Sequence, residues 1–364
     1  LMTKKGYAIY NEIYCIERQN YTVGVNEKTY GLISYYIYSY LLPITAAFGM
    51  IGALICIIVF TRPQMRSSLN IFLAGLSFYD FILLSCSIVI YPMLTNCENN
   101  KVSSSCRVFA KFSLILYPFS LIAQTASVFT CVAITVDRFL AVKYPLRTIM
   151  WSTPSRAFAI TISIGVISFI YKLPSFRETE LDGCGFLMVS DMRRSKWYST
   201  LYLTYSYLIF MLVIPWITMI ILNTTIVRAV HKAYIIRRAL TKQSVDEKER
   251  RCTIMAVVIC IIFVLLNLPA GINFLIDMVD IKLDRNSAFG HLRVPISNLL
   301  VTINSACNLI IYSIFGRRFR RMCTKLFCSC LKKKNYQYLT QIAQQSEGND
   351  VSKKFSNVLQ QKVR

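Results

Sequence analysis

Long apolar segments alternate with short polar stretches along most of the chain. A membrane-spanning helix needs about 20 mostly apolar residues, because each residue rises about 1.5 Å through a hydrocarbon core about 30 Å thick. Seven segments reach that length, and basic residues at their junctions argue against a soluble helical core. The pattern predicts membrane-spanning helices at Leu32–Phe60, Leu69–Leu94, Val108–Val142, Ser155–Lys172, Tyr198–Val230, Thr253–Val279 and Pro295–Phe315.

Polar side chains recur on one face of several of these segments. Lipid cannot satisfy such groups, so polar faces at helical spacing predict a wet interior between the helices. Hydrogen bonds between helices also explain an isolated Ser or Thr, but they explain a lone acid less well. The polar positions are Asp80 in the second segment, Tyr117, Ser120, Gln124 and Ser127 in the third, Asn267 and Asp277 in the sixth, and Asn298, Thr302, Ser305, Asn308 and Tyr312 in the seventh.

The composition agrees with a membrane protein. Of the 364 residues 55% are hydrophobic and 16% are charged, whereas a soluble domain averages about 25% charged residues. The formal charge of +23 would suggest nucleic acid in a soluble protein. Because the basic residues lie in the gaps between apolar segments, we expect a lipid bilayer as the partner and do not expect nucleic acid. We find no zinc spacing, no nucleotide-binding glycine loop and no nucleophile–base pair, so an enzyme is not expected.

The basic residues also predict the orientation of the chain. Most of the 41 Lys and Arg lie in the loops and tail on the side of the C-terminus, so the positive-inside rule places the N-terminus outside the cell, in a multi-pass plasma-membrane protein. Asn20 begins an Asn-Tyr-Thr glycosylation sequon, which agrees with that orientation. The expected domains are an extracellular segment at 1–31, a seven-helix bundle at 32–315, an amphipathic helix at 316–330 and a disordered cytoplasmic tail at 331–364.

Three cysteines follow the seventh segment on the predicted inner side. Cysteines at this place are candidates for palmitoylation, and unmodified thiols are the alternative. The three positions are Cys323, Cys328 and Cys330.

Short motifs inside the segments are similar to those of one family. They are Leu69-Asn70 with Asp80, Asp137-Arg138-Phe139 followed by Ala141–Leu146, Pro215, Pro269 and Asn308–Tyr312. With them the sequence resembles a rhodopsin-like (class A) G-protein-coupled receptor across about residues 30–330. Finer stretches resemble invertebrate, and in particular nematode, FMRFamide-type neuropeptide receptors. These stretches are Arg62–Ser68, Ala123–Ser127 and Ile303–Asn308.

The sequence departs from the family pattern at several positions. Ala53 stands where the family has an asparagine in the first helix, and Gly165 lies near the place of a missing tryptophan in the fourth. Asn267, Leu309 and Asn223 also differ from many receptors, but these three departures occur among peptide receptors of this group. The first two are less usual and could weaken folding or basal signalling.

The resemblance implies a receptor for a short amidated peptide that activates a heterotrimeric G protein, with arrestin as a further partner. A chemosensory receptor of the same fold is the alternative. A transporter or channel would show repeated halves or helices interrupted at matching positions, which are absent here. A biogenic-amine receptor is disfavoured, because Ser120 rather than an acid faces the ligand in the third helix.

The resemblance also implies two sites inside the bundle. The first is a G-protein switch, in which Arg138 is held at rest and released when the sixth helix moves outward; its residues are Asp137, Arg138, Glu249, Asn223 and Tyr312. The second is an allosteric sodium site, in which one carboxylate supplies the charge and neutral oxygens complete the shell; its residues are Asp80, Ser127, Asn304, Ser305 and Asn308. A protonated Asp80 in a water network is the alternative to sodium, and no other cofactor is expected.

The resemblance suggests a peptide that ends in Arg-Phe-amide. Such a peptide needs an acid for its arginine, an aromatic wall for its phenyl ring and amide groups for its carboxamide. We expect Asp277 to meet the arginine, and Gln124 and Asn267 to meet the carboxamide. The full expected ligand set is Tyr117, Ser120, Gln124, Tyr207, Asn267, Phe274, Asp277 and Asn298. The alternative is that the acids near the outer rim are solvated and that the amides bond to each other.

The resemblance implies a disulfide between the top of the third helix and the second outer loop. The family's cysteine at the top of that helix would fall near Ser113, and Cys106 is seven residues earlier. We therefore expect Cys106 to pair with Cys184, which leaves Cys15 and Cys97 as a possible second pair. A bond between Cys97 and Cys106 is the alternative.

Overall fold

A computed structural model describes residues 27–99, 104–183, 185, 187–240, 247–278 and 288–327. Several sequence predictions fall outside these residues, and the structure does not test them. They concern Asn20, Cys328, Cys330 and the side chain of Glu249; Cys15 and Cys184 also lie outside the described residues.

Seven helices within the described residues are long and apolar enough to cross a bilayer, which confirms the predicted fold class. Their bounds are Gly31–Phe60, Ser68–Cys97, Ser104–Lys143, Pro154–Arg177, Lys196–Lys232, Thr253–Met278 and Phe289–Phe315. Six of them agree closely with the predicted segments. The seventh begins before the predicted start at Pro295, because this proline lies inside a helix that begins at Ala288.

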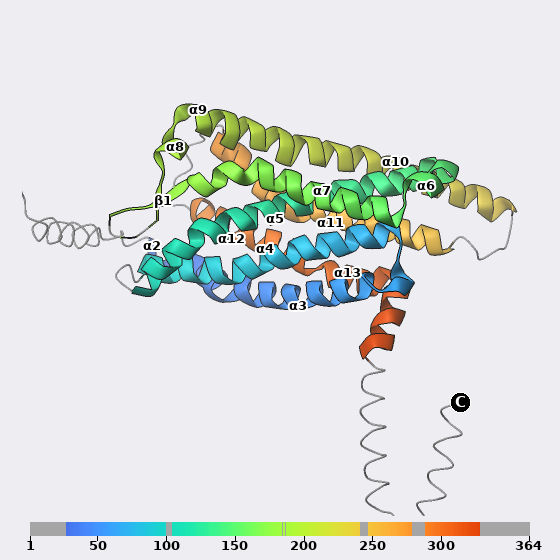
Figure 1. The fold of residues 1–364 in the computed structure, drawn as a ribbon, viewed down its shortest axis with the longest axis horizontal. Coiled ribbons are helices and arrows are strands. Elements are labelled where there is room, and N and C mark those ends of the chain that lie inside the picture. Colours follow the sequence, from blue (N-terminus) through green and yellow to red (C-terminus); the bar gives the residue numbers. More distant parts are fainter. Residues whose placement is uncertain are drawn as a thin grey trace, which may run out of the picture. The chain divides into compact units, whose positions relative to one another are not determined.

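The spans are built from the following elements (Figure 1). In chain order they are α2 (Glu27–Tyr36), η1 (Ile37–Leu41), α3 (Leu42–Phe60), η2 (Pro63–Met65), α4 (Ser68–Asn99), α5 (Ser104–Lys143), α6 (Pro145–Trp151), α7 (Pro154–Lys172), η3 (Leu173–Arg177), β1 (Thr179–Leu181), β2 (Leu187–Val189), α8 (Asp191–Arg194), α9 (Lys196–Tyr198), η4 (Ser199–Ser206), η5 (Leu208–Val213), α10 (Ile214–Leu240), α11 (Glu247–Met278), α12 (Ala288–Ala306) and α13 (Asn308–Phe315). A separate unit begins at Gly316 and contains a short helix at 317–327.

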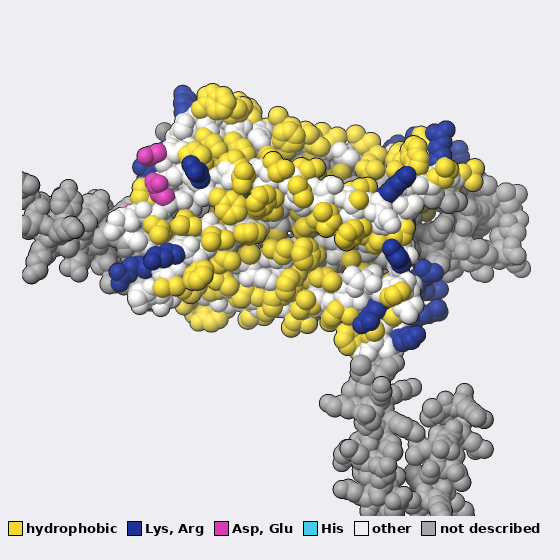
Figure 2. All heavy atoms as spheres, in the orientation of Figure 1, with side chains coloured by type: hydrophobic (Ala, Val, Ile, Leu, Met, Phe, Trp, Pro, Cys, Tyr) yellow, Lys and Arg dark blue, Asp and Glu magenta, His cyan; other side chains and the backbone are white. Residues whose placement is uncertain are grey.

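The long helices of the first unit lie side by side as a bundle (Figure 1). Helix α4 packs between α3 and α5, α5 packs against α10, and α11 packs against α12. Contact between α12 and α3 closes the bundle. On the face shown in Figure 2, hydrophobic side chains cover the outer surface of the helices, and Lys and Arg gather towards the helix ends. This distribution fits a bilayer, because lipid accepts apolar side chains and excludes charged ones.

The loop between α7 and α10 contains a short antiparallel hairpin, which the sequence analysis did not predict. Strands β1 and β2 pair with Thr179 opposite Val189 and Leu181 opposite Leu187. Gly185 lies between the strands with a φ of 81°, a conformation that a residue without a Cβ adopts without strain. The strands are too short to give a periodic pattern of apolar residues, so the sequence carried no clear signal for them.

Gly165 is explained by its close contact with Tyr79. The Tyr79 hydroxyl on α4 donates a hydrogen bond of 2.7 Å to the Thr161 carbonyl on α7. A Cβ at position 165 would lie 2.6 Å from that hydroxyl oxygen. Tyr79 therefore needs a glycine at this place, and the side chain of a tryptophan there would collide with it.

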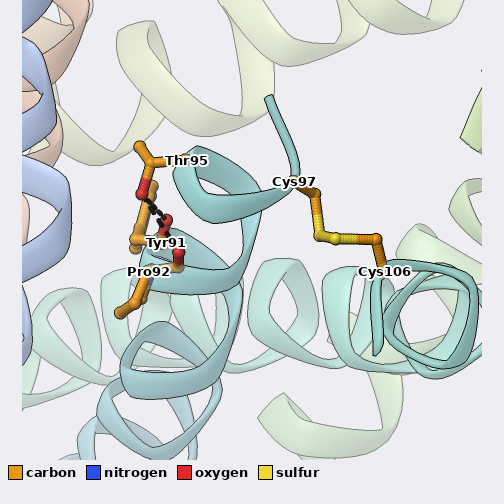
Figure 3. The surroundings of a disulfide bond; sticks show 5 residues. All are labelled: Tyr91, Pro92, Thr95, Cys97 and Cys106. Atoms are coloured by element: carbon orange, nitrogen blue, oxygen red, sulfur yellow. Dashed lines mark hydrogen bonds between the residues drawn. A yellow bond between two sulfur atoms is a disulfide. The ribbon is translucent and has the colours of Figure 1, made fainter. Parts of the chain in front are cut away.

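The disulfide in the described residues joins Cys97 to Cys106, so the predicted bond between Cys106 and Cys184 is wrong (Figure 3). Cys97 lies near the end of α4 and Cys106 lies in the first turn of α5, and their Cα atoms are 5.5 Å apart. The two cysteines are nine positions apart in the sequence, at adjoining ends of consecutive helices, so the bond is a local one. We call this end of the bundle the disulfide end and the opposite end, at Arg138, the Arg138 end.

Candidate functional site

A buried carboxylate lies at the centre of the bundle. Asp80 on α4 is 1% exposed. It accepts hydrogen bonds from Ser127 Oγ on α5 at 2.9 Å, Ser305 Oγ on α12 at 2.8 Å and Asn308 Nδ2 on α13 at 2.6 Å. Four of the five residues predicted for a cation site therefore meet at one carboxylate. The fifth, Asn304, has no hydrogen bond to Asp80 among the described residues, and its carbonyl accepts one from Cys307 Sγ.

A second buried carboxylate lies at the Arg138 end. Asp137 accepts a hydrogen bond from Arg138 Nε at 3.1 Å, and a guanidinium nitrogen of Arg138 also contacts it. Ser68 Oγ at the start of α4 donates to Asp137 at 2.7 Å, and Ser152 Oγ after α6 donates to it as well. Asp137 is thus fixed by groups from two further elements, and it holds the Arg138 side chain beside it.

A polar contact joins three helices in the same half of the bundle. Thr135 Oγ1 on α5 lies 3.0 Å from Cys260 Sγ on α11, and Asn223 on α10 also interacts with Cys260. Tyr312 is fully buried, and its ring packs edge-on against Phe60 at 5.0 Å between ring centres. Asn223 and Tyr312, both predicted for the switch, are therefore packed inside the bundle in this structure.

The acid predicted for the ligand's arginine is already paired. Asp277 at the disulfide end of α11 forms an ion pair of 2.6 Å with Arg293 on α12. Asn273 Nδ2 donates to the Arg293 carbonyl at 2.8 Å and to Ser297 Oγ at 2.5 Å, which fixes α11 against α12 nearby. Sequence reasoning missed Arg293, because an arginine at a helix end is usually a solvated residue at the membrane boundary.

A second acid of the disulfide end is also engaged. Glu178 is 2% exposed, and it accepts hydrogen bonds from Ser175 at 2.8 Å, Arg193 at 2.9 Å and Tyr198 at 3.0 Å. Glu180, on β1, is exposed to solvent. Two carboxylates at the disulfide end, Asp277 and Glu178, thus already have basic partners.

Two of the expected aromatic residues form one wall. The rings of Tyr207, between η4 and η5, and Phe274 on α11 lie 4.6 Å apart between their centres. Tyr117, the third expected ring, lies on α5, where its carbonyl accepts a hydrogen bond of 2.7 Å from Ser120 Oγ. Phe274 lies one helical turn from Asp277 on the same helix, so an aromatic surface and an acid are close neighbours here.

The expected amide groups have different surroundings. Asn267 Nδ2 donates to the Phe263 carbonyl at 2.8 Å within its own helix. Asn298 Nδ2 donates to the Tyr38 hydroxyl at 3.0 Å, and the Tyr38 ring stacks on Tyr91 at 5.2 Å. Gln124 is half-buried on α5. No hydrogen bond joins Gln124 to Asn267 among the described residues, so the two expected carboxamide partners do not bond to each other.

Comparison with known proteins gives the family context for this geometry. Residues 52–312 match the family described as "7 transmembrane receptor (rhodopsin family)". The chain is 32% identical over 306 residues to the FMRFamide receptor of Drosophila melanogaster, covering 81% of this chain and 54% of that protein. It is 31% identical over 284 residues to an FMRFamide peptide receptor of Caenorhabditis elegans, covering 75% and 65%. The chain thus spans less than two thirds of the length of either relative.

Proposed function

This chain belongs to the rhodopsin family of seven-transmembrane receptors, and from that premise we propose that it binds a short peptide ending in Arg-Phe-amide and activates a heterotrimeric G protein. The family is one of receptors rather than enzymes, and the similarity to FMRFamide receptors places the chain among the neuropeptide-type members.

The observation that carries the ligand class is the aromatic pair of Tyr207 and Phe274 beside Asp277. A terminal phenylalanine ring stacks well on such a wall, since aromatic pairs add about 0.5–1.5 kcal/mol beyond the area they bury. The arginine that precedes it in the peptide would reach the Asp277 carboxylate one turn away. Because Asp277 holds Arg293 in this structure, the ligand's arginine would take the place of Arg293.

The contacts at the Arg138 end support the proposed activation of a G protein. Asp137 accepts hydrogen bonds from Arg138, Ser68 and Ser152. A hydrogen bond also joins Thr135 to Cys260 of α11. Outward movement of α11 would break the second contact and open a path to Arg138, a planar five-donor group suited to changing partners. A ligand shifts this equilibrium only by binding the open state more tightly than the closed one.

We place the Arg138 end in the cytoplasm and the disulfide end outside the cell, at the plasma membrane. The positive-inside distribution of Lys and Arg supports this orientation. A disulfide at the outer end supports it too, because disulfides form in the secretory pathway and are rare in the cytosol. In this orientation the G protein, and arrestin after it, would bind at the Arg138 end.

The Asp80 cluster supports an allosteric sodium ion in the resting state. A single buried carboxylate lies beside two hydroxyl oxygens and an amide, and oxygen ligands of this kind suit a hard cation. Ser127, Ser305 and Asn308 belong to three helices, so an ion held there would stabilise their present arrangement around α4. Asp80 would supply the charge and the hydroxyl groups would supply neutral oxygens.

Screening amidated peptides against cells that express the chain tests the proposal. Phe-Met-Arg-Phe-amide and N-terminally extended forms should produce a concentration-dependent G-protein signal that cells without the receptor do not give. A receptor that reaches the surface and responds only to small volatile or soluble compounds would favour the chemosensory alternative instead.

A further inference from the structure

Lys172 is a buried cation outside the residues to which the proposed function gives a role. It lies in the last turn of α7 and is 7% exposed. A buried charge near the membrane is unfavourable unless a partner compensates it. Nothing in the sequence distinguishes Lys172, because a lysine at the end of an apolar helix usually extends into solvent.

Three tyrosine rings surround the Lys172 ammonium. The nitrogen lies 4.8 Å from the ring centre of Tyr171, 5.7 Å from that of Tyr207 and 5.8 Å from that of Tyr202. Tyr202 donates a hydrogen bond of 2.6 Å to the Tyr171 carbonyl, and the Tyr171 hydroxyl lies 2.9 Å from Ser206 Oγ. The rings are thus held in place, and their faces attract the cation.

Aromatic faces do not replace hydrogen-bond acceptors for an ammonium, which has three N–H donors. Within the described residues no ion pair includes Lys172. Glu178 is the acid whose charge acts on it, but the Glu178 carboxylate is engaged by Ser175, Arg193 and Tyr198. Within the part of the chain that the structure describes, no carboxylate is therefore paired with the ammonium.

A second polar group lies one turn away on the same helix. Ser168 is 1% exposed, and its hydroxyl has no hydrogen-bond partner among the described residues. Residues four apart lie on the same face of a helix, so Ser168 and Lys172 point the same way from α7. Together they offer one strong donor and one group that can accept a hydrogen bond, which is the complement of a primary carboxamide.

The two groups lie beside the aromatic wall of the proposed ligand site, since Tyr207 contacts both the Lys172 ammonium and the Phe274 ring. In a C-terminal phenylalanine amide the ring and the carboxamide belong to one residue, so their separation is on the order of 5 Å. A ring on the Tyr207 wall would thus bring the carboxamide within reach of Lys172.

We propose that Lys172 and Ser168 form the subsite for the ligand's terminal carboxamide. Lys172 donates to the carboxamide oxygen, and Ser168 Oγ accepts from the carboxamide N–H. The inference rests on the proposed function, because it requires an amidated peptide. It also reassigns the role first expected of Gln124 and Asn267. The Nδ2 group of Asn267 already donates a hydrogen bond within its own helix.

A double-mutant cycle between receptor and peptide tests this subsite. The probes are Phe-Met-Arg-Phe-amide and Phe-Met-Arg-phenethylamide, which keeps the phenyl ring but lacks the carboxamide. Loss of the carboxamide should raise the half-maximal concentration at the unchanged receptor at least about tenfold, as expected for a hydrogen bond from a charged donor. In the Lys172→Met receptor the two peptides should differ by less than about threefold.

The control variants separate a specific contact from a folding defect. Lys172→Arg should keep most of the difference between the peptides, and Ser168→Ala should reduce it. Lys196→Met removes an exposed lysine from the same end of the bundle and should leave it unchanged. Because the readout is a ratio at one receptor, reduced surface expression does not imitate the effect.

An unchanged ratio in Lys172→Met would overturn the inference while leaving the proposed function intact. Should Lys172→Met fail to reach the surface, Lys172→Gln takes its place with the same expected loss. A surface-expressed unchanged receptor that responds to neither peptide contradicts the proposed function itself, and the subsite falls with it.

Discussion

The Arg293 guanidinium on α12 lies 2.6 Å from the Asp277 carboxylate on α11. This pair joins the two helices at the disulfide end, where the ligand's arginine is expected to bind. The Asp277 side chain is 61% exposed and that of Arg293 is 18% exposed. Ion pairs with so much solvent contact are worth about 0.2–1 kcal/mol, so a peptide arginine can displace Arg293 at little cost.

Removing the internal competitor should therefore increase sensitivity to the peptide. Arg293→Gln should lower the half-maximal concentration of an Arg-Phe-amide peptide by about two- to fivefold, which corresponds to the free energy of an exposed pair. The measurement is a concentration–response curve at matched surface expression. Asp277→Ala should shift the curve in the opposite direction. For a peptide whose arginine is replaced by citrulline, neither substitution should shift the half-maximal concentration much. Equal shifts for both peptides would refute the exchange of Arg293 for the peptide's arginine.

Sodium should reduce agonist affinity through Asp80. A cation held by Asp80, Ser127 and Ser305 favours the resting arrangement, so agonist dissociation constants should rise several-fold between sodium-free and sodium-containing buffer. Asp80→Asn removes the charge while keeping the size, and it should abolish this dependence. Replacing sodium by the larger organic cation N-methyl-D-glucamine controls for ionic strength. Agonist binding that is indifferent to sodium at the unchanged receptor would exclude the ion.

The disulfide should be found between Cys97 and Cys106. Trypsin cuts after Lys101, between the two cysteines, so the bond should appear as two peptides joined in a non-reduced digest and separated after reduction. Closing a loop of this size contributes about 2–3 kcal/mol in the chain-entropy account, so Cys97→Ser should lower thermal stability in detergent. A fragment that joins Cys106 to Cys184 would show that the helix-to-loop bond forms after all.

Gly165→Ala should destabilise the packing of α7 on α4. The new Cβ would lie 2.6 Å from the Tyr79 hydroxyl, and moving the tyrosine would break its hydrogen bond to the Thr161 carbonyl. The expected cost is about 1–2 kcal/mol, measured as a lower midpoint of thermal unfolding in detergent. In a Tyr79→Phe background, which lacks the hydroxyl, the same substitution should cost clearly less. Equal costs in both backgrounds would contradict this explanation of the glycine.

The spans and the central polar cluster were predictable from the sequence for the same physical reason. Lipid allows only apolar outer faces and backbones bonded within the helix, so span lengths follow from the apolar segments. Asp80 and the seventh-helix residues Ser305 and Asn308 are costly in lipid, and they had to face the bundle interior. The structure brings these groups together with Ser127.

The ends of the helices were less predictable, because solvent permits many partners there. Asp277 had several possible cations, and only the packing of α11 against α12 selects Arg293. Cys106 had three possible partners, and sequence alone does not choose among them; the structure pairs it with Cys97, nine positions earlier in the sequence. Lys172 carried no signal, because its tyrosine neighbours come from two different helices.

The most direct test of the proposed function compares peptide-stimulated G-protein activation by the unchanged receptor and by Arg138→Ala at equal surface expression. We predict that Phe-Met-Arg-Phe-amide or an extended form activates G protein in a concentration-dependent manner at the unchanged receptor. Arg138→Ala should still bind the peptide but give no activation, because the group that Asp137 holds at rest would be missing. Full activation by Arg138→Ala, or no response of the unchanged receptor to any amidated peptide, would contradict the account.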